Sequence, residues 1–254
     1  MRDFNHFVYW LKNYTDLSEY STGRYSKAIH IIALELEEYG LPKVNLYNSN
    51  SLFINQILNN DSFKIKNNKV NRMYSSALRQ LIKYLEFCNE KEFQEELTKD
   101  ELYYEKNIIS NISSDSNVNS DLIDEALEKP PHRIVSNHRL WSRNPKFASD
   151  SVANANYLCE FNNSHKDFIS KYTQQNYVEA HHLIPIKYQE DFEYSLDVYA
   201  NIVSLCMVCH KKLHYGLFDD KKEILDKLFA SRESRLVKSN IDLTIDDLYN
   251  YYKD

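Results

Sequence analysis

Glycine is scarce in this sequence, with three residues among 254. Neither the P-loop pattern nor the G-x-G-x-x-G pattern occurs, so we expect no nucleotide cofactor. No apolar run approaches the roughly 18 residues that a membrane helix needs, and we expect no membrane partner. The first residues lack the apolar segment of a signal peptide. We therefore expect a cytoplasmic protein.

Cysteine is also sparse, and the charge is not that of a uniformly basic nucleic-acid binder. The four cysteines come without a secretion signal, which favours free thiols or metal ligands over a disulfide framework. The net charge of -6 leaves room for a local basic face, which is all that DNA binding needs. Hydrophobic residues at 43% and charged residues at 27% are typical of a globular chain.

Composition divides the chain into three regions. Residues 1–97 carry apolar side chains at helical spacing, which predicts a helical N-terminal domain, a candidate for target recognition. Residues 98–137 are acidic and rich in serine and asparagine, and we expect a linker with a short helix over Asp121–Glu128. Residues 138–254 contain the chemically distinctive residues, followed by C-terminal helices.

Histidine and cysteine gather in this third region. Four of the nine histidines and two of the four cysteines fall between His181 and His214. Imidazole and thiolate are ligands of borderline-soft metals. Cys206 and Cys209 have the C-x-x-C spacing of a zinc knuckle. His210 and His214 are four residues apart, so on a helix they share one face and can hold a different metal.

Local patterns predict the elements that carry these residues. Strand character is expected over residues 177–184, ended by Pro185, and over residues 201–205. A helix is expected from His210 to about Gly216. Asn144 and Pro145 are typical of the start of another helix. A capping-box-like start at Thr244 predicts the last helix.

The ordered set resembles the HNH nuclease family, whose core is the ββα-metal finger. The matching residues are Glu179-Ala180-His181-His182-Leu183-Ile184-Pro185, Asn201-Ile202-Val203-Ser204-Leu205, Cys206-Met207-Val208-Cys209-His210 and His214. The resemblance implies a mainly α protein with a small ββα-metal finger, α+β overall. It also implies that residues 138–254 form a nuclease domain, with C-terminal helices, that hydrolyses DNA phosphodiester bonds with the help of a metal.

The resemblance further assigns roles at matching positions. His181, His210 and His214 would hold one catalytic divalent metal (Mg, Mn, Ni, Co or Zn), with His210 also counted among the catalytic residues. His182 would be the general base that deprotonates water, and Asn201 would brace the loop and orient that base. Three imidazoles favour a transition metal. Glu179 shares the strand face of His181 and is a candidate to orient it.

A structural zinc needs four ligands, of which Cys206 and Cys209 supply two. Family members often have a second C-x-x-C before the first strand, but here Asn162 stands where its second cysteine would be. We expect Cys159 and His165 to complete a Cys₃His site. The alternative is a set of buried thiols without metal.

Basic residues indicate where DNA would bind. Arg133, Arg139, Arg143 and Lys146 occur without an intervening acid, with Trp141 among them, and Lys211 and Lys212 follow His210. The alternative is that the arginines are ordinary surface residues and that Trp141 belongs to the core.

The segment before Cys159 and the tail after Gly216 are similar to bacterial HNH proteins of the restriction-endonuclease type. This similarity implies cleavage of foreign DNA, and a homodimer would cut both strands. Two alternatives stay open. One is a monomeric nicking or structure-specific nuclease of a mobile element or phage. The other is a non-catalytic, zinc-stabilised DNA-binding module.

Overall fold

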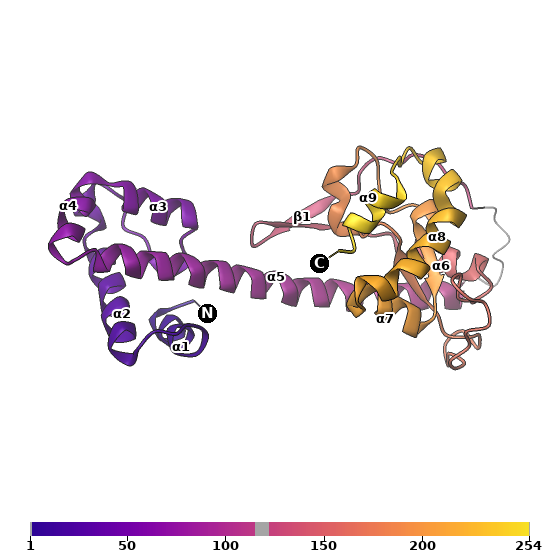
Figure 1. Ribbon diagram of the computed structural model, residues 1–254, viewed down its shortest axis with the longest axis horizontal. Helices are drawn as coiled ribbons and strands as arrows, with labels where there is room; N and C mark the ends of the chain where they lie inside the picture. Colours follow the sequence, from indigo (N-terminus) through magenta and orange to yellow (C-terminus); the bar gives the residue numbers. More distant parts are fainter. Residues whose placement is uncertain (1, 115–121, 254) are drawn as a thin grey trace. The chain divides into compact units, whose positions relative to one another are not determined.

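The computed structural model describes residues 2–114 and 122–253, and the chain divides into two units, Met1–Glu95 and Glu96–Asp254 (Figure 1). The long helix α5 (Met73–Ser114) begins in the first unit and ends in the second. Within the described ranges, none of the helices combines the length and apolarity needed to cross a lipid bilayer.

The first unit is helical, as the apolar spacing predicts. Its helices before α5 are α1 (Phe4–Tyr14), α2 (Glu19–Leu34), α3 (Ser51–Asn59) and α4 (Asp61–Lys69), with short 3₁₀ helices η1 (Leu36–Tyr39) and η2 (Leu46–Asn48) between α2 and α3. Asp3, Ser18, Asn50 and Asn60 cap the four α-helices by accepting a backbone N–H. Phe7, Ile29, Ile54 and Tyr84 are among the fully buried side chains of its core.

The segment expected to be a linker differs from that prediction. Helix α5 runs through residues 98–114, because residues 73–114 contain neither proline nor glycine and Tyr104 buries its ring. The described residues 122–131 contain no regular helix, so the short helix expected over Asp121–Glu128 is wrong there, and Asp121 itself lies outside the described residues. Among the described residues, most serines of this stretch lie in the last turns of α5.

A β-hairpin precedes the predicted helix at Asn144. Strands β1 (His132–Val135) and β2 (His138–Trp141) pair antiparallel. Ser136 and Asn137 form its turn with φ of 48° and 70°, a left-handed pair that suits a two-residue hairpin loop. Helix α6 (Pro145–Asn154) then begins as predicted, with the Asn144 side chain accepting from the Lys146 N–H.

Two strands and a helix form the finger of the second unit. Strands β3 (Glu179–His182) and β4 (Ile202–Leu205) pair antiparallel and are shorter than predicted. Helix η3 (Ile186–Asp191) and helix η4 (Tyr199–Asn201) occupy the connection between them. Helix α7 (Met207–Tyr215) ends at Gly216, where a Cβ atom would lie 2.6 Å from the Lys212 carbonyl oxygen.

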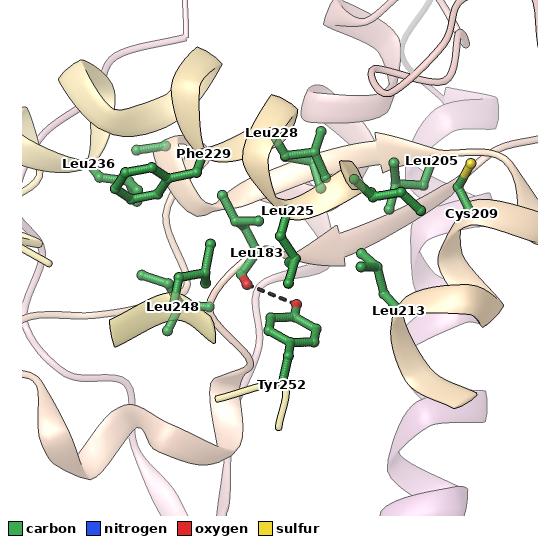
Figure 2. Packing of buried hydrophobic residues seen from close by; sticks show 14 of the residues in the cluster. Leu183, Leu205, Cys209, Leu213, Leu225, Leu228, Phe229, Leu236, Leu248 and Tyr252 are labelled. Atoms are coloured by element: carbon green, nitrogen blue, oxygen red, sulfur yellow. Dashed lines mark hydrogen bonds between the residues drawn. The ribbon is translucent and has the colours of Figure 1, made fainter. Parts of the chain in front are cut away.

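Two more helices complete the core of this unit. They are α8 (Phe218–Lys238) and α9 (Ile245–Asn250), and α9 has the predicted capping box between Thr244 and Asp247. Leu225 and Leu228 of α8 pack with Leu183 and Leu205 of the strand segments (Figure 2). Each fully buried leucine contributes about 1.5–3 kcal/mol, so α8 fixes β4 and the segment of β3, which carries His181 and His182.

Candidate metal centres

Three imidazoles meet where β3 faces α7. The His181 ring centroid lies 4.9 Å from that of His210 and 5.1 Å from that of His214. One ligand nitrogen from each ring lies within 4.8 Å of the others. His210 and His214 reach this point together because they are one helical turn apart on α7. The structure thus brings together the three residues predicted to hold the catalytic metal.

Hydrogen bonds decide which nitrogens are available to a cation. His210 Nδ1 contacts the Glu179 carboxylate, so its Nδ1–H donates, and in the neutral ring Nε2 is the nitrogen with a free lone pair. His210 Nε2 lies 3.1 Å from His214 Nε2. Two ring nitrogens at this separation can share one cation when both are unprotonated, and three imidazoles are a donor set for transition metals. The residues present therefore fit a divalent metal.

Glu179 orients a different histidine from the one expected. The prediction paired it with His181, because the two side chains share one face of β3. That face is turned toward α7, and the Glu179 carboxylate contacts His210 there. Burial opposes ionisation of Glu179, but the bonds from His210 and Tyr177 outweigh burial and lower its pKa overall. The carboxylate is thus a charged partner for His210.

Tyr252 fixes the tautomer of His181. The Tyr252 hydroxyl donates to the Leu183 carbonyl at 2.8 Å (Figure 2), and burial raises its pKa, so it stays protonated. Its oxygen lies 2.9 Å from His181 Nε2. Because the hydroxyl proton is already used, His181 Nε2–H must donate, which leaves Nδ1 unprotonated. No sequence pattern indicated this tyrosine, which lies 71 positions from His181.

Burial keeps two rings of the cluster, His181 and His214, uncharged at neutral pH. Burial and then the neighbouring imidazoles lower the pKa of His181 well below its ordinary value. Burial and then His210 lower the pKa of His214 to about 4. Neutral imidazoles have the free lone pairs that a metal requires.

Replacing Tyr252 by phenylalanine should weaken metal binding at this cluster by about 10- to 100-fold. The His181 Nε2–H then has no hydroxyl oxygen to donate to, and the ring is no longer held in the tautomer that binds metal. Titration calorimetry with Mn²⁺ or Ni²⁺ on zinc-loaded protein measures this change. Tyr249→Phe is the matched control, since it also removes a tyrosine hydroxyl bond, to Asp226, only three residues before Tyr252. Equal metal affinity in the two variants would contradict the role of Tyr252.

His182 points away from this cluster and contacts a carboxylate. Neighbours on a strand face opposite sides. His182 Nε2 lies 2.9 Å from Asp197 Oδ1, and Asp197 is 4% exposed. A neutral His182 that donates Nε2–H to this carboxylate keeps an unprotonated Nδ1. No sequence pattern pointed to Asp197. Its closeness in the chain to Asn201, four residues later, was the one local hint that it belongs to the site.

Asn201 holds the loop between β3 and β4. It is fully buried, accepts from the Ile184 N–H at 2.7 Å, and donates to the carbonyls of Ile184 and Leu196 at 3.0 and 2.8 Å. These bonds match the expected bracing of the loop. The contact that orients His182 comes from Asp197 instead.

A second cluster contains Cys159, His165, Cys206 and Cys209, with ligand atoms within 4.8 Å of one another. His165 Nδ1 lies 3.5 Å from both Cys206 Sγ and Cys209 Sγ. Sulfurs bound to one zinc at ~2.3 Å lie about 3.7 Å apart, so this set fits a tetrahedral Cys₃His zinc site. Burial raises the pKa of Cys206 and Cys209, so zinc binding must displace thiol protons.

The predicted DNA-contacting residues have acidic partners. Arg133 pairs with Glu96 and Asp100, Arg139 with Glu190, Arg143 with Asp100, and Lys146 with Asp150. Trp141 is 6% exposed, as the alternative interpretation expects of a core residue. Lys211 and Lys212 are exposed on α7, beside His210. The basic stretch is therefore largely neutralised by contacts within its own unit.

Comparison with known proteins relates one segment of the chain to a known family. The model of the HNH endonuclease family matches residues 159–216. This range spans both clusters, β3, β4 and α7. Searches of curated proteins and of solved structures found no match.

Proposed function

We propose that this protein is a metal-dependent endonuclease that hydrolyses DNA phosphodiester bonds, since residues 159–216 match the model of the HNH endonuclease family. One observation carries the proposal. Three imidazoles converge on one point, and the adjacent His182 is backed by a buried carboxylate. A strand, a strand and a helix hold this arrangement.

His182 is the group that takes the proton in the proposed reaction. Asp197 receives the Nε2–H, so Nδ1 is the acceptor for a proton from water. The carboxylate then stabilises the imidazolium that forms, as in other histidine–aspartate pairs. Imidazole is suited to this task because its ordinary pKa is close to neutral.

His181, His210 and His214 would hold the catalytic divalent ion, whether Mg, Mn, Ni, Co or Zn. A divalent metal bound there supplies positive charge to the phosphate and to the leaving 3′ oxygen. Glu179 and Tyr252 keep two of the rings in the tautomer that binds. The Cys159, His165, Cys206 and Cys209 cluster would hold a structural zinc that anchors the start of α7.

The proposed substrate is foreign DNA, in a restriction or defence role. Lys211 and Lys212 are exposed next to His210 and suit contacts with the phosphate backbone. One finger cuts one strand, so a two-fold symmetric homodimer would cut both. The helical unit Met1–Glu95 is proposed to recognise the target, and residues 96–254 to form the nuclease unit.

Supercoiled plasmid incubated with the zinc-loaded protein and Mg²⁺, Mn²⁺, Ni²⁺, Co²⁺ or Zn²⁺ tests this function. We expect conversion to linear DNA with 5′-phosphate and 3′-hydroxyl ends, because water attacks phosphorus and the 3′ oxygen leaves. Modified and unmodified plasmids are compared in parallel. Accumulation of open circles alone would indicate the nicking alternative. Binding without cleavage under every metal would indicate the non-catalytic DNA-binding module.

A further inference from the structure

One turn of α5, outside the segment that matches the family, contacts the chain beside the Asp197–His182 pair. Asp100 Oδ2 accepts from Arg143 Nη2 at 2.7 Å. The guanidinium carbon of Arg143 also lies 4.2 Å from the ring centroid of Tyr104, four residues further along α5. The Arg143 side chain is 13% exposed. An ion pair and a cation–π contact therefore hold the same partly buried guanidinium.

The residue after Arg143 contacts Asp197 directly. The Asn144 N–H donates to Asp197 Oδ2 at 2.5 Å, while Asp197 Oδ1 receives His182. The Asn144 side chain caps α6, so α6 holds this residue from the other side. The two oxygens of Asp197 are thus assigned to the two partners, and the position of the Asn144 N–H determines where the carboxylate lies.

We propose that the α5 turn of Asp100 and Tyr104 is a positioning element for His182, acting through Arg143, the Asn144 N–H and Asp197. The inference rests on the proposed role of His182. Burial and then the Asp197 carboxylate raise the pKa of Tyr104, as expected for a ring packed near that carboxylate. The turn belongs to the segment that composition alone assigns to a linker.

Arg143 then has a structural role in place of the DNA contact that its sequence context predicts. An arginine that contacts DNA must present its guanidinium to a phosphate or to a base edge. Here Asp100 neutralises the guanidinium and Tyr104 covers one face of it. Loss of a DNA contact would raise KM and weaken the salt dependence of binding. Loss of a positioning contact would lower kcat and leave KM unchanged.

Asp100→Asn tests the inference in the full-length protein, with Glu96→Gln as its matched control. Glu96 lies one turn before Asp100, and both pair with Arg133, but Asp100 alone of the two pairs with Arg143. Arg143→Lys is a second variant that keeps the charge but loses the planar fork. Hydrogen exchange at the Asn144 amide and the kcat and KM of cleavage are measured, with thermal unfolding as a check.

We expect the Asn144 amide to exchange on the order of tenfold faster in Asp100→Asn and in Arg143→Lys, because its bond to Asp197 is less well held. We expect kcat to fall by about tenfold at constant KM, as misplacement of a catalytic group predicts. Glu96→Gln should match the wild type in both measurements.

Unchanged Asn144 exchange in both variants would overturn the inference. A change in KM at constant kcat would also overturn it, and would return Arg143 to a DNA-contacting role. If the wild-type protein does not cleave DNA, the proposed function fails. The exchange at Asn144 still decides whether α5 holds Asp197, so the two failures are distinguishable.

Discussion

With His182 replaced by alanine, we expect the rate of DNA cleavage to fall by about 10²- to 10⁴-fold, the usual contribution of a positioned general base. The finger has four imidazoles. Among the described residues, His182 is the one of these four that contacts Asp197, and the other three form the candidate metal cluster. Single-turnover cleavage of a labelled duplex at saturating Mn²⁺ or Ni²⁺ measures the chemical step. Asp197→Asn should give a smaller loss, because the imidazole remains but its tautomer is no longer fixed.

Two controls separate this effect from loss of metal or fold. His182 is not among the metal-facing donors, so calorimetry should show unchanged metal affinity in the alanine variant. His30→Ala, an exposed substitution on α2, should cleave at the wild-type rate. Wild-type cleavage by the His182 variant under saturating metal would show that another group accepts the proton.

Cys206→Ser should remove the structural zinc and destabilise the second unit by roughly 5 kcal/mol, since structural zinc binding contributes about 10–16 kcal/mol in small fingers. Serine is itself a good N-cap, so the start of α7, where Cys206 accepts from the Cys209 N–H, should survive the exchange. The loss of stability in Cys206→Ser therefore measures the loss of zinc and not the loss of the helix cap. Zinc content by mass spectrometry and unfolding in urea measure it.

Cys88→Ser is the matched control for this prediction. Cys88 is buried like the other cysteines, but it lies in the core of the first unit and outside the Cys₃His cluster. The Cys88→Ser variant should therefore bind as much zinc as the wild type, and its second unit should be equally stable. A Cys206 variant with wild-type zinc content and an unchanged unfolding transition would favour buried thiols without metal.

Some features of the site follow from spacing along the chain. His210 and His214 share a helix face because four residues make about one turn, and Cys206 and Cys209 meet at a helix start for a similar reason. His181 and His182 face opposite ways because strand neighbours alternate. The mainly helical fold with a small finger is confirmed, because the periodicity of its helices is local.

Other features depend on contacts between distant segments. Composition predicts a linker over residues 98–137, but helix α5 occupies the first part of this segment. Asp100 of the same segment pairs with Arg133 and Arg143 of the basic stretch. The hairpin of β1 and β2 also escaped prediction, because its turn residues, Ser136 and Asn137, lack the glycine that usually marks such a turn.

Local spacing and the resemblance to the HNH family were enough to predict the candidate metal ligands and the order of strand, strand and helix that carries them, because strand alternation and helical turns depend on residues close in the chain. Which carboxylate faces which imidazole became visible only in the folded chain. Asp197 meets His182, Glu179 meets His210 rather than His181, and Tyr252 meets His181. The physical reason is that a side-chain hydrogen bond depends on where two backbones cross, and separation along the chain does not specify that crossing.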